Sequence, residues 1–506
     1  MRFNLKTIIT SVLFLATFML AQGQQRTIDE GDEYFKATEY LKAKQLYKKV
    51  YDSKPTNALL YKIAECERLQ KNYVLAEKSY TELLRTEEFP PEALYNIATV
   101  YINNSKYREA LDKLNEYSIA NTEDKRTAPL KESCKWAMKN AQNKSDYSTN
   151  TTQDVLINGL CFGLAYYKDG LVYARPKKNE EGVNTQTYEM VYTDVLNKKN
   201  ATAPFDKLVT SKLFIGSPAL SANAKTFYFS KNLSSKKLST KASYGKNGIS
   251  SDGKNTLGIF ITKSINNVWE EPTPVAFNNI EYSCTHPTLM SNGRVMYFAS
   301  NMPGGYGGYD IYISEFSAGN WLKPVNAGTK VNTAGNEMFP FLHNDTALYF
   351  SSTGLPGLGG ADVFKIKVAN IATQNPVNMG AGVNSFKDDF GVILNKDGSE
   401  GYMATNRYTD DNVDMVLTLK KSYAMKELTT AIIDEETGKP VVDTDVLVYI
   451  GDSLVAFETS DKNGLINLSL DGRFKYHIVV QNKGYDTFEK DFDARTDEAN
   501  GFKICL

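Results

Sequence analysis

Two aspartates are the residues whose type and spacing first suggest chemistry. Asp310 follows the glycine-rich loop PGGYGGY and Asp362 follows LPGLGGA, and the two aspartates lie 52 residues apart. Recurring carboxylates could act in acid–base catalysis or bind a metal ion. A residue that recurs in each copy of a repeat more often holds the copy together, so we expect both side chains to cap backbone N–H groups in turns. Asp194 and Asp414 occupy approximately equivalent places.

The glycine-rich loops invite comparison with phosphate-binding loops. A phosphate-binding loop needs a helix N-terminus behind it, which directs N–H groups and a dipole at the anion. Both loops run directly into strand-like sequence, so their glycines are predicted to supply positive φ at tight corners. The three histidines, His286, His343 and His477, lie far apart, and no metalloprotease, serine hydrolase or nucleotide-binding motif is present. The sequence therefore predicts no catalytic residue, no metal site and no cofactor.

Charge and cysteine content exclude some classes of protein. The formal net charge of −1 offers no electrostatic field for nucleic acid or an anionic membrane, so no nucleic-acid partner is expected. The five cysteines are far apart, form no CxxC pair and are odd in number. Disulfides are therefore not expected to be the main framework of the fold, and the thiols are interpreted as small buried side chains.

An internal repeat contains the elements that position the aspartates. The segment from His286 to Val368 holds two copies, in which Tyr297 aligns with Tyr349 and Asp310 aligns with Asp362. Each copy predicts an apolar strand, a turn, an alternating aromatic strand, the glycine loop, a further alternating strand and a proline-bearing edge. Four antiparallel strands repeated at this length predict a β-propeller blade, in which these tyrosines and aspartates have structural roles.

Fainter copies flank the two clear ones. Tyr173, Tyr228 and Tyr402 mark them at spacings of 55, 69 and 53 residues, and a polar insertion after Leu233 explains the longest spacing. We count five blades between about residues 154 and 422, and a sixth blade split between the two ends is the main alternative. The glycine-rich loops are the predicted partner-facing part of the propeller, through Met302, Pro303, Tyr306, Leu355, Pro356 and Leu358.

The chain begins with a predicted export signal. Arg2 and Lys6 precede the apolar run IITSVLFLATFMLA and a small-residue site that ends at Gly23, which is the pattern of a secretory signal peptide over residues 1–23. The run is short for a membrane span, and a single membrane anchor is the alternative. No cysteine follows the site, so lipid attachment is not indicated. The mature protein is expected to be exported and soluble.

Residues 24–143 show a helical period and a repeat of 33 or 34 residues. Small residues recur at two positions and a large residue follows the second by four, at Gly31, Ala64 and Ala98, at Ala43, Ala76 and Ala110, and at Tyr47, Tyr80 and Leu114. This tetratricopeptide (TPR) pattern predicts three helical hairpins, a capping helix and a groove lined by the first helix of each hairpin. The residues expected to face the groove are Tyr61, Glu65, Arg68, Tyr95, Thr99 and Ile102.

The remaining segments complete a multidomain chain, helical first and all-β afterwards. The polar stretch 144–153 is predicted to be a linker. Residues 426–497 alternate in short strands broken by turns, which predicts a small immunoglobulin- or transthyretin-like β-sandwich, and residues 498–506 form a tail. The sandwich resembles the carboxypeptidase regulatory-like domain, through a T-G-x-P turn at Thr437–Pro440, a D-x-x-G turn at Asp461–Gly464 and Gly484-Tyr485. In that resemblance the module is an accessory fold without catalysis.

The blade motif Y-F-x-S followed by G-G-x-G-G-x-D-I-Y resembles the PD40 or TolB-type propeller, which is WD40-like. The order of signal, TPR arm, propeller and regulatory-like sandwich is similar to PorE-type proteins of Bacteroidetes, which are periplasmic, outer-membrane-associated components of type IX secretion and gliding. The resemblance implies the same location and envelope proteins as partners, among them an outer-membrane barrel of the PorP/SprF type. That family usually ends in an OmpA-like domain, which this chain lacks, so peptidoglycan binding is not expected.

Two functions from different classes follow. The leading hypothesis is a non-enzymatic scaffold that bridges envelope proteins in secretion or surface-protein assembly. The second is a propeller that binds or hydrolyses a glycan or peptide around its central channel. The second function needs acidic residues that converge on the channel from several blades, and the sequence offers none beyond the recurring aspartates.

Overall fold

The computed structural model describes residues 22–86, 88–142, 145–151, 161–178, 184–195, 202–209, 211, 214–233, 250, 255–408, 414–421, 425–494, 497 and 504–506. Most of the predicted signal peptide, most of the insertion after Leu233 and residues 498–503 of the predicted tail lie outside these ranges. The chain divides into two compact units, Met1–Lys420 and Lys421–Leu506.

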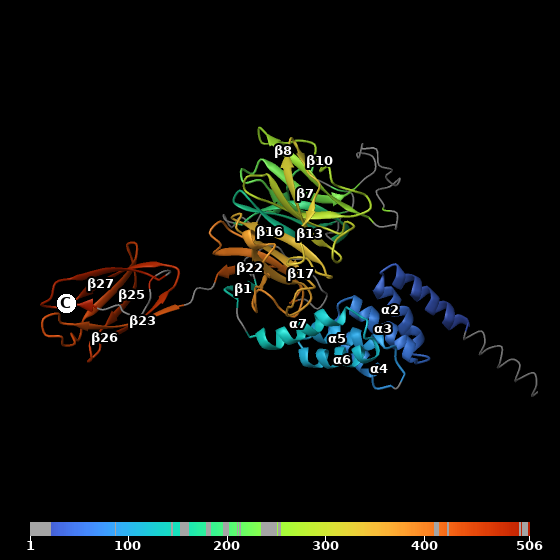
Figure 1. The fold of residues 1–506 in the computed structure, drawn as a ribbon, viewed down its shortest axis with the longest axis horizontal. Coiled ribbons are helices and arrows are strands. Elements are labelled where there is room, and N and C mark those ends of the chain that lie inside the picture. The colour runs from blue at the N-terminus through green and yellow to red at the C-terminus, as the bar shows by residue number, and fades with distance from the viewer. Residues whose placement is uncertain are drawn as a thin grey trace, which may run out of the picture. The chain divides into compact units, whose positions relative to one another are not determined.

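The first unit begins with a helical arm, residues 22–142, whose helices pair into hairpins (Figure 1). Residues 22–36 are helical, and they are followed by α2 (Tyr40–Tyr51), α3 (Asn57–Leu69), α4 (Tyr73–Leu83), α5 (Glu92–Ile102), α6 (Tyr107–Ala120) and α7 (Thr127–Asn140). Thr56 caps the N-terminus of α3 by accepting a hydrogen bond from the backbone of Leu59, and Asn72 caps α4 through Leu75. Among the described residues, no helix is both long and apolar enough to cross a bilayer.

Small residues lie where the helices of the arm approach one another. A Cβ atom on Gly31 would lie 2.7 Å from the ring of Tyr47, so this position has no room for a side chain. The other repeated positions are almost completely buried, namely Ala43, Ala64, Ala76, Ala98, Ala110, Tyr47, Tyr80 and Leu114. The 33- to 34-residue period therefore reflects close helix packing with one large side chain filling the space beside each small one.

The rest of the first unit is built from antiparallel sheets. Each sheet has a first strand, a tyrosine-marked second strand and a third strand that follows a loop. Two of them contain β2 (Phe162–Tyr167), β3 (Gly170–Lys178), β4 (Asn184–Asp194) and β5 (Thr202–Pro204), and then β6 (Ile215–Leu220), β7 (Thr226–Asn232), β8 (Leu257–Ile265), β9 (Val268–Trp269) and β10 (Thr273–Pro274).

The two clear sequence copies form the next two sheets, and a further sheet follows. Their strands are β11 (Cys284–Leu289), β12 (Val295–Ser300), β13 (Asp310–Ser317), β14 (Asn320–Trp321) and β15 (Val325–Asn326); β16 (Glu337–His343), β17 (Ala347–Ser352), β18 (Asp362–Lys367) and β19 (Val377–Asn378); and β20 (Asp389–Leu394), β21 (Glu400–Thr405) and β22 (Met415–Lys421). Tyr297 and Tyr349 occupy equivalent registers, opposite Ile313 and Lys365.

The sheets are arranged as a β-propeller. Their first strands, β2, β6, β11, β16 and β20, are neighbours in that order, and β20 is again next to β2. The last sheet is completed by β1 (Tyr147–Thr151), which pairs with β22 although it precedes the first sheet in the chain. These residues fall in the stretch 144–153 that is predicted to be a linker, so that prediction is wrong for β1. Tyr147 anchors the strand, because its ring is buried and its hydroxyl donates to the carbonyl of Gly398 at 2.8 Å.

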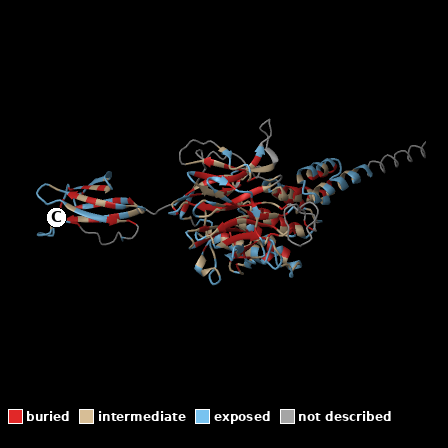
Figure 2. Cartoon of the chain, turned by 90° about the horizontal axis from the view of Figure 1, so that it is seen from above, coloured by how far each residue is buried: buried red, intermediate tan, exposed pale blue. Residues whose placement is uncertain are grey.

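Apolar side chains pack between neighbouring sheets. Tyr297 and Ile311 of one sheet contact the same core as Leu348 and Phe350 of the next. Figure 2 shows buried residues along the strands and exposed residues mainly in the connections. Because full burial of one large apolar side chain stabilises a fold by about 1.5–3 kcal/mol, these layers hold the ring and position the loops at its rim.

The second unit contains two small sheets around an apolar core. One has the order β26 (Leu465–Asp471), β23 (Met425–Ile433) and β29 (Ile504–Cys505), and the other has β25 (Ser453–Thr459), β24 (Asp445–Ile450), β27 (Lys475–Gln481) and β28 (Phe488–Asp493). Leu428, Val446 and Ile478 are fully buried in this core. The predicted turn at Asp461–Gly464 is closed by the Asp461 carboxylate, which accepts hydrogen bonds from the backbone of Asn463 and Leu465 at 2.8 Å each.

Candidate functional site

The recurring aspartates cap the glycine-rich loops that precede them. Asp310 Oδ2 accepts a hydrogen bond from the backbone of Tyr306 at 2.6 Å. Asp362 Oδ2 accepts from the backbones of Leu358 and Gly359 at 3.0 Å each. Both side chains are buried, and the Oδ1 atom of each has no hydrogen-bond partner among the described residues. Burial raises the pKa of Asp362 to about 8, so this carboxyl is largely protonated at neutral pH.

The other two aspartates are not equivalent. Asp194 ends β4 opposite Gly170, whereas Asp310 begins β13. Asp414 precedes Met415, and Met415 is the residue that stands at the register of Asp310. The sequence comparison placed Asp414 one residue away from its structural equivalent and Asp194 at the wrong end of its strand.

Each capping aspartate faces a second carboxylate from the next sheet. Glu337 begins β16 and Asp389 begins β20, and both are fully buried. Glu337 accepts hydrogen bonds from the backbone and hydroxyl of Thr333 and from the hydroxyl of Ser352, at 2.6–2.8 Å. Burial raises the pKa of Glu337, and the charge of Asp310 adds to this effect.

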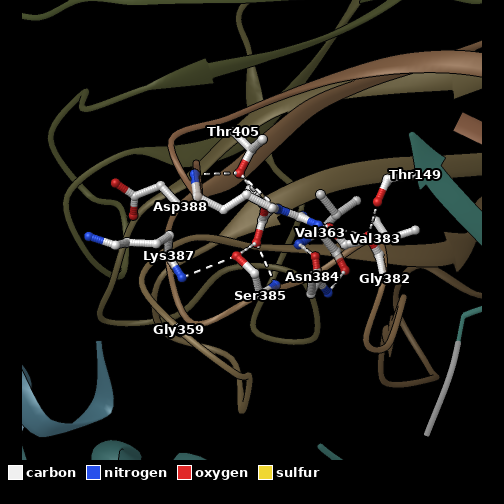
Figure 3. A network of polar contacts seen from close by, with 12 residues as sticks. Thr149, Gly359, Val363, Gly382, Val383, Asn384, Ser385, Lys387, Asp388 and Thr405 are labelled. Carbon is white, nitrogen blue, oxygen red and sulfur yellow. Dashed lines mark hydrogen bonds and ion pairs between the residues drawn. The ribbon is translucent and has the colours of Figure 1, made fainter. Parts of the chain in front are cut away.

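The junction at Asp389 carries its own cation. Arg407 forms a buried ion pair with Asp389, and its guanidinium also donates to the carbonyls of Gly382 and Val383. Ser385 and Thr405, labelled in Figure 3, donate their hydroxyls to the same carboxylate at 2.8 and 2.6 Å. Burial raises the pKa of Asp389, and Arg407 opposes this shift.

Sequence reasoning missed a recurring buried asparagine in three sheets. Asn332 Oδ1 accepts from the backbone of Ile311 at 2.7 Å and its Nδ2 donates to the same residue's carbonyl at 2.9 Å. Asn384 binds Val363 in the same way, as Figure 3 shows, and Asn278 binds Ile259. The signal was present in the sequence, because Asn332 and Asn384 lie 52 residues apart, which is the spacing of the aspartates.

These polar groups therefore hold loops and strands in place. Their donors are backbone amides, side-chain amides, hydroxyls and a guanidinium from the same or the adjacent sheet. Within the described ranges, no group of three or more His, Cys, Asp or Glu side chains is placed to bind a metal ion. The arrangement fixes the geometry of the propeller rim.

The first strands of the sheets surround a central cavity of about 400 Å³. Each of these strands contains one irregularity in register, and the residue at that point has positive φ: Gly163, Ser217, His286, Phe339 and Gly391. Proline follows in three of the strands and removes a backbone N–H that the irregular ladder would leave without a partner. The recurring x-Pro dipeptide is the signal in the sequence from which this feature could have been predicted.

His286 is the histidine of the cavity wall. Its ring lies 3.9 Å from that of Phe339, and Phe339 lies 4.9 Å from Phe390. The Nδ1 atom is buried and has no hydrogen-bond partner among the described residues. Burial lowers the pKa of His286 to about 3, so the imidazole is neutral at physiological pH. The described residues that line the cavity include no aspartate or glutamate.

The remaining histidines and the cysteines serve elsewhere. His343 Nε2 contacts the carbonyl of Asn395 at 3.0 Å, and His477 contacts Asp491 at 3.0 Å in the second unit. All five cysteines are free thiols, and all except Cys505 are buried.

The residues predicted for the groove of the arm lie on a shared face of α3 and α5, with one exception. Asn96 donates to the hydroxyl of Tyr61 at 3.2 Å and to Glu65 at 2.7 Å, and Arg68 forms an ion pair with Glu65 at 2.8 Å. Tyr95 stacks under the guanidinium of Arg126, while Thr99 is half-buried. Ile102 is a correction, because it packs with Ala98, Leu114 and Cys134 in the core of the arm and is 4% exposed.

The arm contacts the propeller at one of the two glycine-rich loops. The hydroxyl of Tyr107 donates to the carbonyl of Leu358 at 2.7 Å, and Lys71 pairs with Asp388. Lys387 lies over the ring of Tyr73, 5.0 Å from its centroid. Burial by itself would raise the pKa of Asp388. The charge of Lys71 and the hydrogen bonds that the carboxylate accepts lower the pKa by more than burial raises it, so the pKa lies below its usual value.

The two loops predicted to face a partner consequently differ in how exposed they are. Met302, Pro303 and Tyr306 lie at or near the surface, and Tyr306 is 51% exposed. Leu358 is buried and Leu355 and Pro356 are half-buried, so the expectation that this second loop is open to a partner is wrong. The sequence could not reveal the difference, because it arises from a contact between segments about 250 residues apart.

Removing the hydroxyl of Tyr107 should loosen the covered loop. In Tyr107→Phe the carbonyl of Leu358 loses its donor, which costs about 0.5–1.5 kcal/mol. Amide hydrogen exchange in residues 355–361 is expected to accelerate about two- to tenfold, while exchange in residues 303–309 stays unchanged. Tyr306→Phe is the matched control, because its ring is exposed. Equal exchange in the two variants would contradict the contact.

Comparisons with known proteins give no family assignment. No protein-family model and no curated protein matches the chain. An exo-β-1,3-galactanase from Clostridium thermocellum is 10% identical with a TM-score of 0.34, over 69% of this chain and 82% of that one. A protein described as TolB from Agrobacterium tumefaciens is 11% identical with a TM-score of 0.26, over 58% and 85%. The tricorn protease is 10% identical with a TM-score of 0.30, over 61% of this chain and 27% of its own length.

These likenesses are distant and assign no activity. The chain spans about a quarter of the length of the tricorn protease structure that it resembles.

Proposed function

We propose that the protein is a non-enzymatic scaffold of the periplasm, associated with the outer membrane, which binds envelope proteins in type IX secretion or surface-protein assembly. We assign it a TPR arm, a five-bladed propeller closed by β1, and a regulatory-like sandwich. The export signal and the order of modules in the sequence support the location and the pathway. A barrel of the PorP/SprF type is the partner that the resemblance implies.

The observation that supports the proposal is that the recurring buried polar side chains form hydrogen bonds within the framework of the propeller. The recurring aspartates and asparagines bind backbone amides of their own loops and strands, so they are committed to the framework. The described wall of the central cavity has no carboxylate. Hydrolases commonly use paired carboxylates or an activated nucleophile, and neither is supplied at this cavity by the described residues. The protein is therefore expected to act through surfaces.

The shared face of α3 and α5 is the first of these surfaces. Tyr61, Arg68, Tyr95 and Thr99 are half-buried there. A hydrogen bond from Asn96 holds the hydroxyl of Tyr61, and the guanidinium of Arg126 packs over the ring of Tyr95. A face whose side chains are fixed before binding loses less conformational entropy when a partner docks. A peptide or a helix of an envelope protein is the proposed occupant.

Blocking this face tests the proposal. Thr99→Arg places a long side chain at its centre, and Ile119→Arg is the matched control because Ile119 is 82% exposed on α6. Full-length protein carrying each change is captured from cross-linked cell envelopes, and the co-captured proteins are quantified by mass spectrometry. Thr99→Arg should reduce recovery of the main envelope partner about tenfold or more, and the control should not. Equal recovery from both would exclude this face, and recovery of no envelope protein by any form would overturn the scaffold proposal.

The central cavity favours one second function, the binding of a small glycan or peptide. Its volume of about 400 Å³ lies within the range of ligand sites, and His286 presents a neutral ring beside Phe339. Titration with a panel of oligosaccharides and short peptides, followed by fluorescence and by product analysis, would distinguish binding from turnover. His286→Leu should abolish any such binding.

A further inference from the structure

The glycine-rich loops of the third and fourth sheets have the same local structure. A Cβ atom on Gly307 would meet the carbonyls of Gly335 and Thr333 within about 2.5 Å, and one on Gly359 would meet those of Lys387 and Ser385 at 2.6 Å. The hydrogen bonds that cap the loops are also equivalent, because Asp310 accepts from the backbone of Tyr306 and Asp362 accepts from the backbone of Leu358. The loop at 303–309 therefore presents its backbone at the rim in the way that the loop at 355–361 does.

Among the residues that the structure describes, only one of the two loops is covered by another segment. The loop at 355–361 is covered by the turn between α5 and α6, through Tyr107 and through Asn103, whose Oδ1 atom lies 3.7 Å from the ideal Cβ position of Gly360. Residues 303–308 are all exposed. A surface with the same backbone geometry as an occupied helix-docking site is therefore uncovered one sheet away.

The uncovered loop differs in its side chains. Tyr306 stands where Leu358 stands, Asn336 replaces Asp388 and Gly335 replaces Lys387. The loss of the acid and the lysine removes the charges that Lys71 and Tyr73 of the arm contact. The ring of Tyr306, at the position of Leu358, offers an aromatic surface beside open backbone, a combination that is enriched in protein interfaces.

We propose that the loop at 303–309 is a docking surface for the turn of a helical hairpin in a partner protein, with an aromatic or amide donor directed at the carbonyl of Tyr306 and no requirement for a basic residue. The arm shows this mode of binding on the equivalent loop, where Tyr107 donates to Leu358. The α3–α4 and α5–α6 turns of the chain's own arm already contact the loop at 355–361 and its neighbour Asp388, so the proposed occupant of the equivalent loop is a hairpin of another protein. The inference rests on the scaffold function and names one of its surfaces and the kind of partner.

Site-specific photocrosslinking tests the inference. A photoreactive phenylalanine replaces Tyr306 in the full-length protein expressed in its native cells, and the same residue replaces Tyr408, which is 55% exposed elsewhere on the propeller, as the matched control. A third form carries the probe at Tyr61 on the α3–α5 face. Crosslinks from position 306 should exceed those from position 408 about tenfold and should map to a turn between two helices of another protein.

Each of the other crosslinking results would overturn the inference, the proposed kind of partner or the scaffold function. Crosslinks from position 61 but not from position 306 would overturn the inference and leave the scaffold function in place. Crosslinks from 306 to a non-helical segment, or to a second copy of this chain, would overturn the proposed kind of partner. Absence of crosslinks from both 61 and 306 would overturn the scaffold function with it. Tyr306→Ala, which leaves the Asp310 cap intact, should reduce capture of the crosslinked partner about tenfold.

Discussion

The Arg407→Ala protein is expected to lose about 3–5 kcal/mol of propeller stability. Arg407 and Asp389 are 8% and 0% exposed, so the change leaves a buried carboxylate without its cation. Two backbone carbonyls, of Gly382 and Val383, also lose donors. Denaturant unfolding followed by the fluorescence of Trp269 and Trp321, which are both buried in the propeller, measures the loss.

The pH dependence of this defect provides a second readout. Without Arg407, the folded-state pKa of Asp389, already raised by burial, should rise further. A group with a raised folded-state pKa contributes stability below its unfolded pKa and loses it as pH rises. The defect of Arg407→Ala should therefore be smallest at acidic pH, and Asp389→Asn should restore part of the stability. Lys420→Ala, which breaks an exposed ion pair with Glu400, is the control and should change stability by about 0–1 kcal/mol. If Arg407→Ala lost no more stability than the Lys420→Ala control, the stabilising role of the buried ion pair would be contradicted.

Asp362→Asn is expected to abolish one part of the pH dependence of the protein's stability. Asp362→Ala should abolish the same part, and it should also lower the stability by an amount that does not change with pH. Burial raises the pKa of Asp362 to about 8, so this carboxyl makes wild-type stability fall as pH rises from about 4 to about 8. The slope contributed is at most about 1.4 kcal/mol per pH unit. The neutral amide of asparagine resembles the protonated acid and can still accept from Leu358 and Gly359. Asp362→Asn should therefore equal or exceed wild type in stability at pH 8.

Asp362→Ala should be less stable than Asp362→Asn at every pH, because the backbone N–H groups of Leu358 and Gly359 lose their acceptor at about 1–3 kcal/mol each. Asp397→Asn is the control. Hydrogen bonds from Ser399 hold the pKa of Asp397 below its usual value, so the stability that this carboxylate contributes is complete above about pH 4, and its removal should leave the slope between pH 5 and pH 9 unchanged. Denaturation profiles between pH 5 and pH 9 would show the difference. An unchanged pH slope in Asp362→Asn would show that the carboxyl is ionised in the folded protein.

Local sequence patterns were sufficient to predict the tyrosine-marked strands and the close helix contacts of the arm. The tyrosines recur on the second strand of each sheet because an alternating aromatic strand packs on both sides of a pleated layer. The alanine spacing predicted where the helices of the arm approach, since only a small side chain fits there. Both signals arise from interactions within a few tens of residues, so they are readable without three-dimensional information.

Features set by distant contacts could not be read in the same way. The polar segment at Tyr147–Thr151 has little strand character of its own, and it becomes β1 because β22 offers an open edge. Likewise, the covered and uncovered glycine loops have nearly the same sequence, and only the position of Tyr107 and Lys71 on the arm separates them. Of the candidate site residues, Ile102 and Leu358 were misplaced because burial depends on neighbours that the repeat pattern does not specify.

The closing strand has a mechanical consequence. β1 follows the arm after a few residues, and its partner β22 is the strand from which the chain leaves the propeller. Tension applied to the arm and to the following segment is therefore carried along the backbone to this one pair of strands, while the other sheets lie off that path. Single-molecule pulling from both ends should consequently open the ring at this seam first.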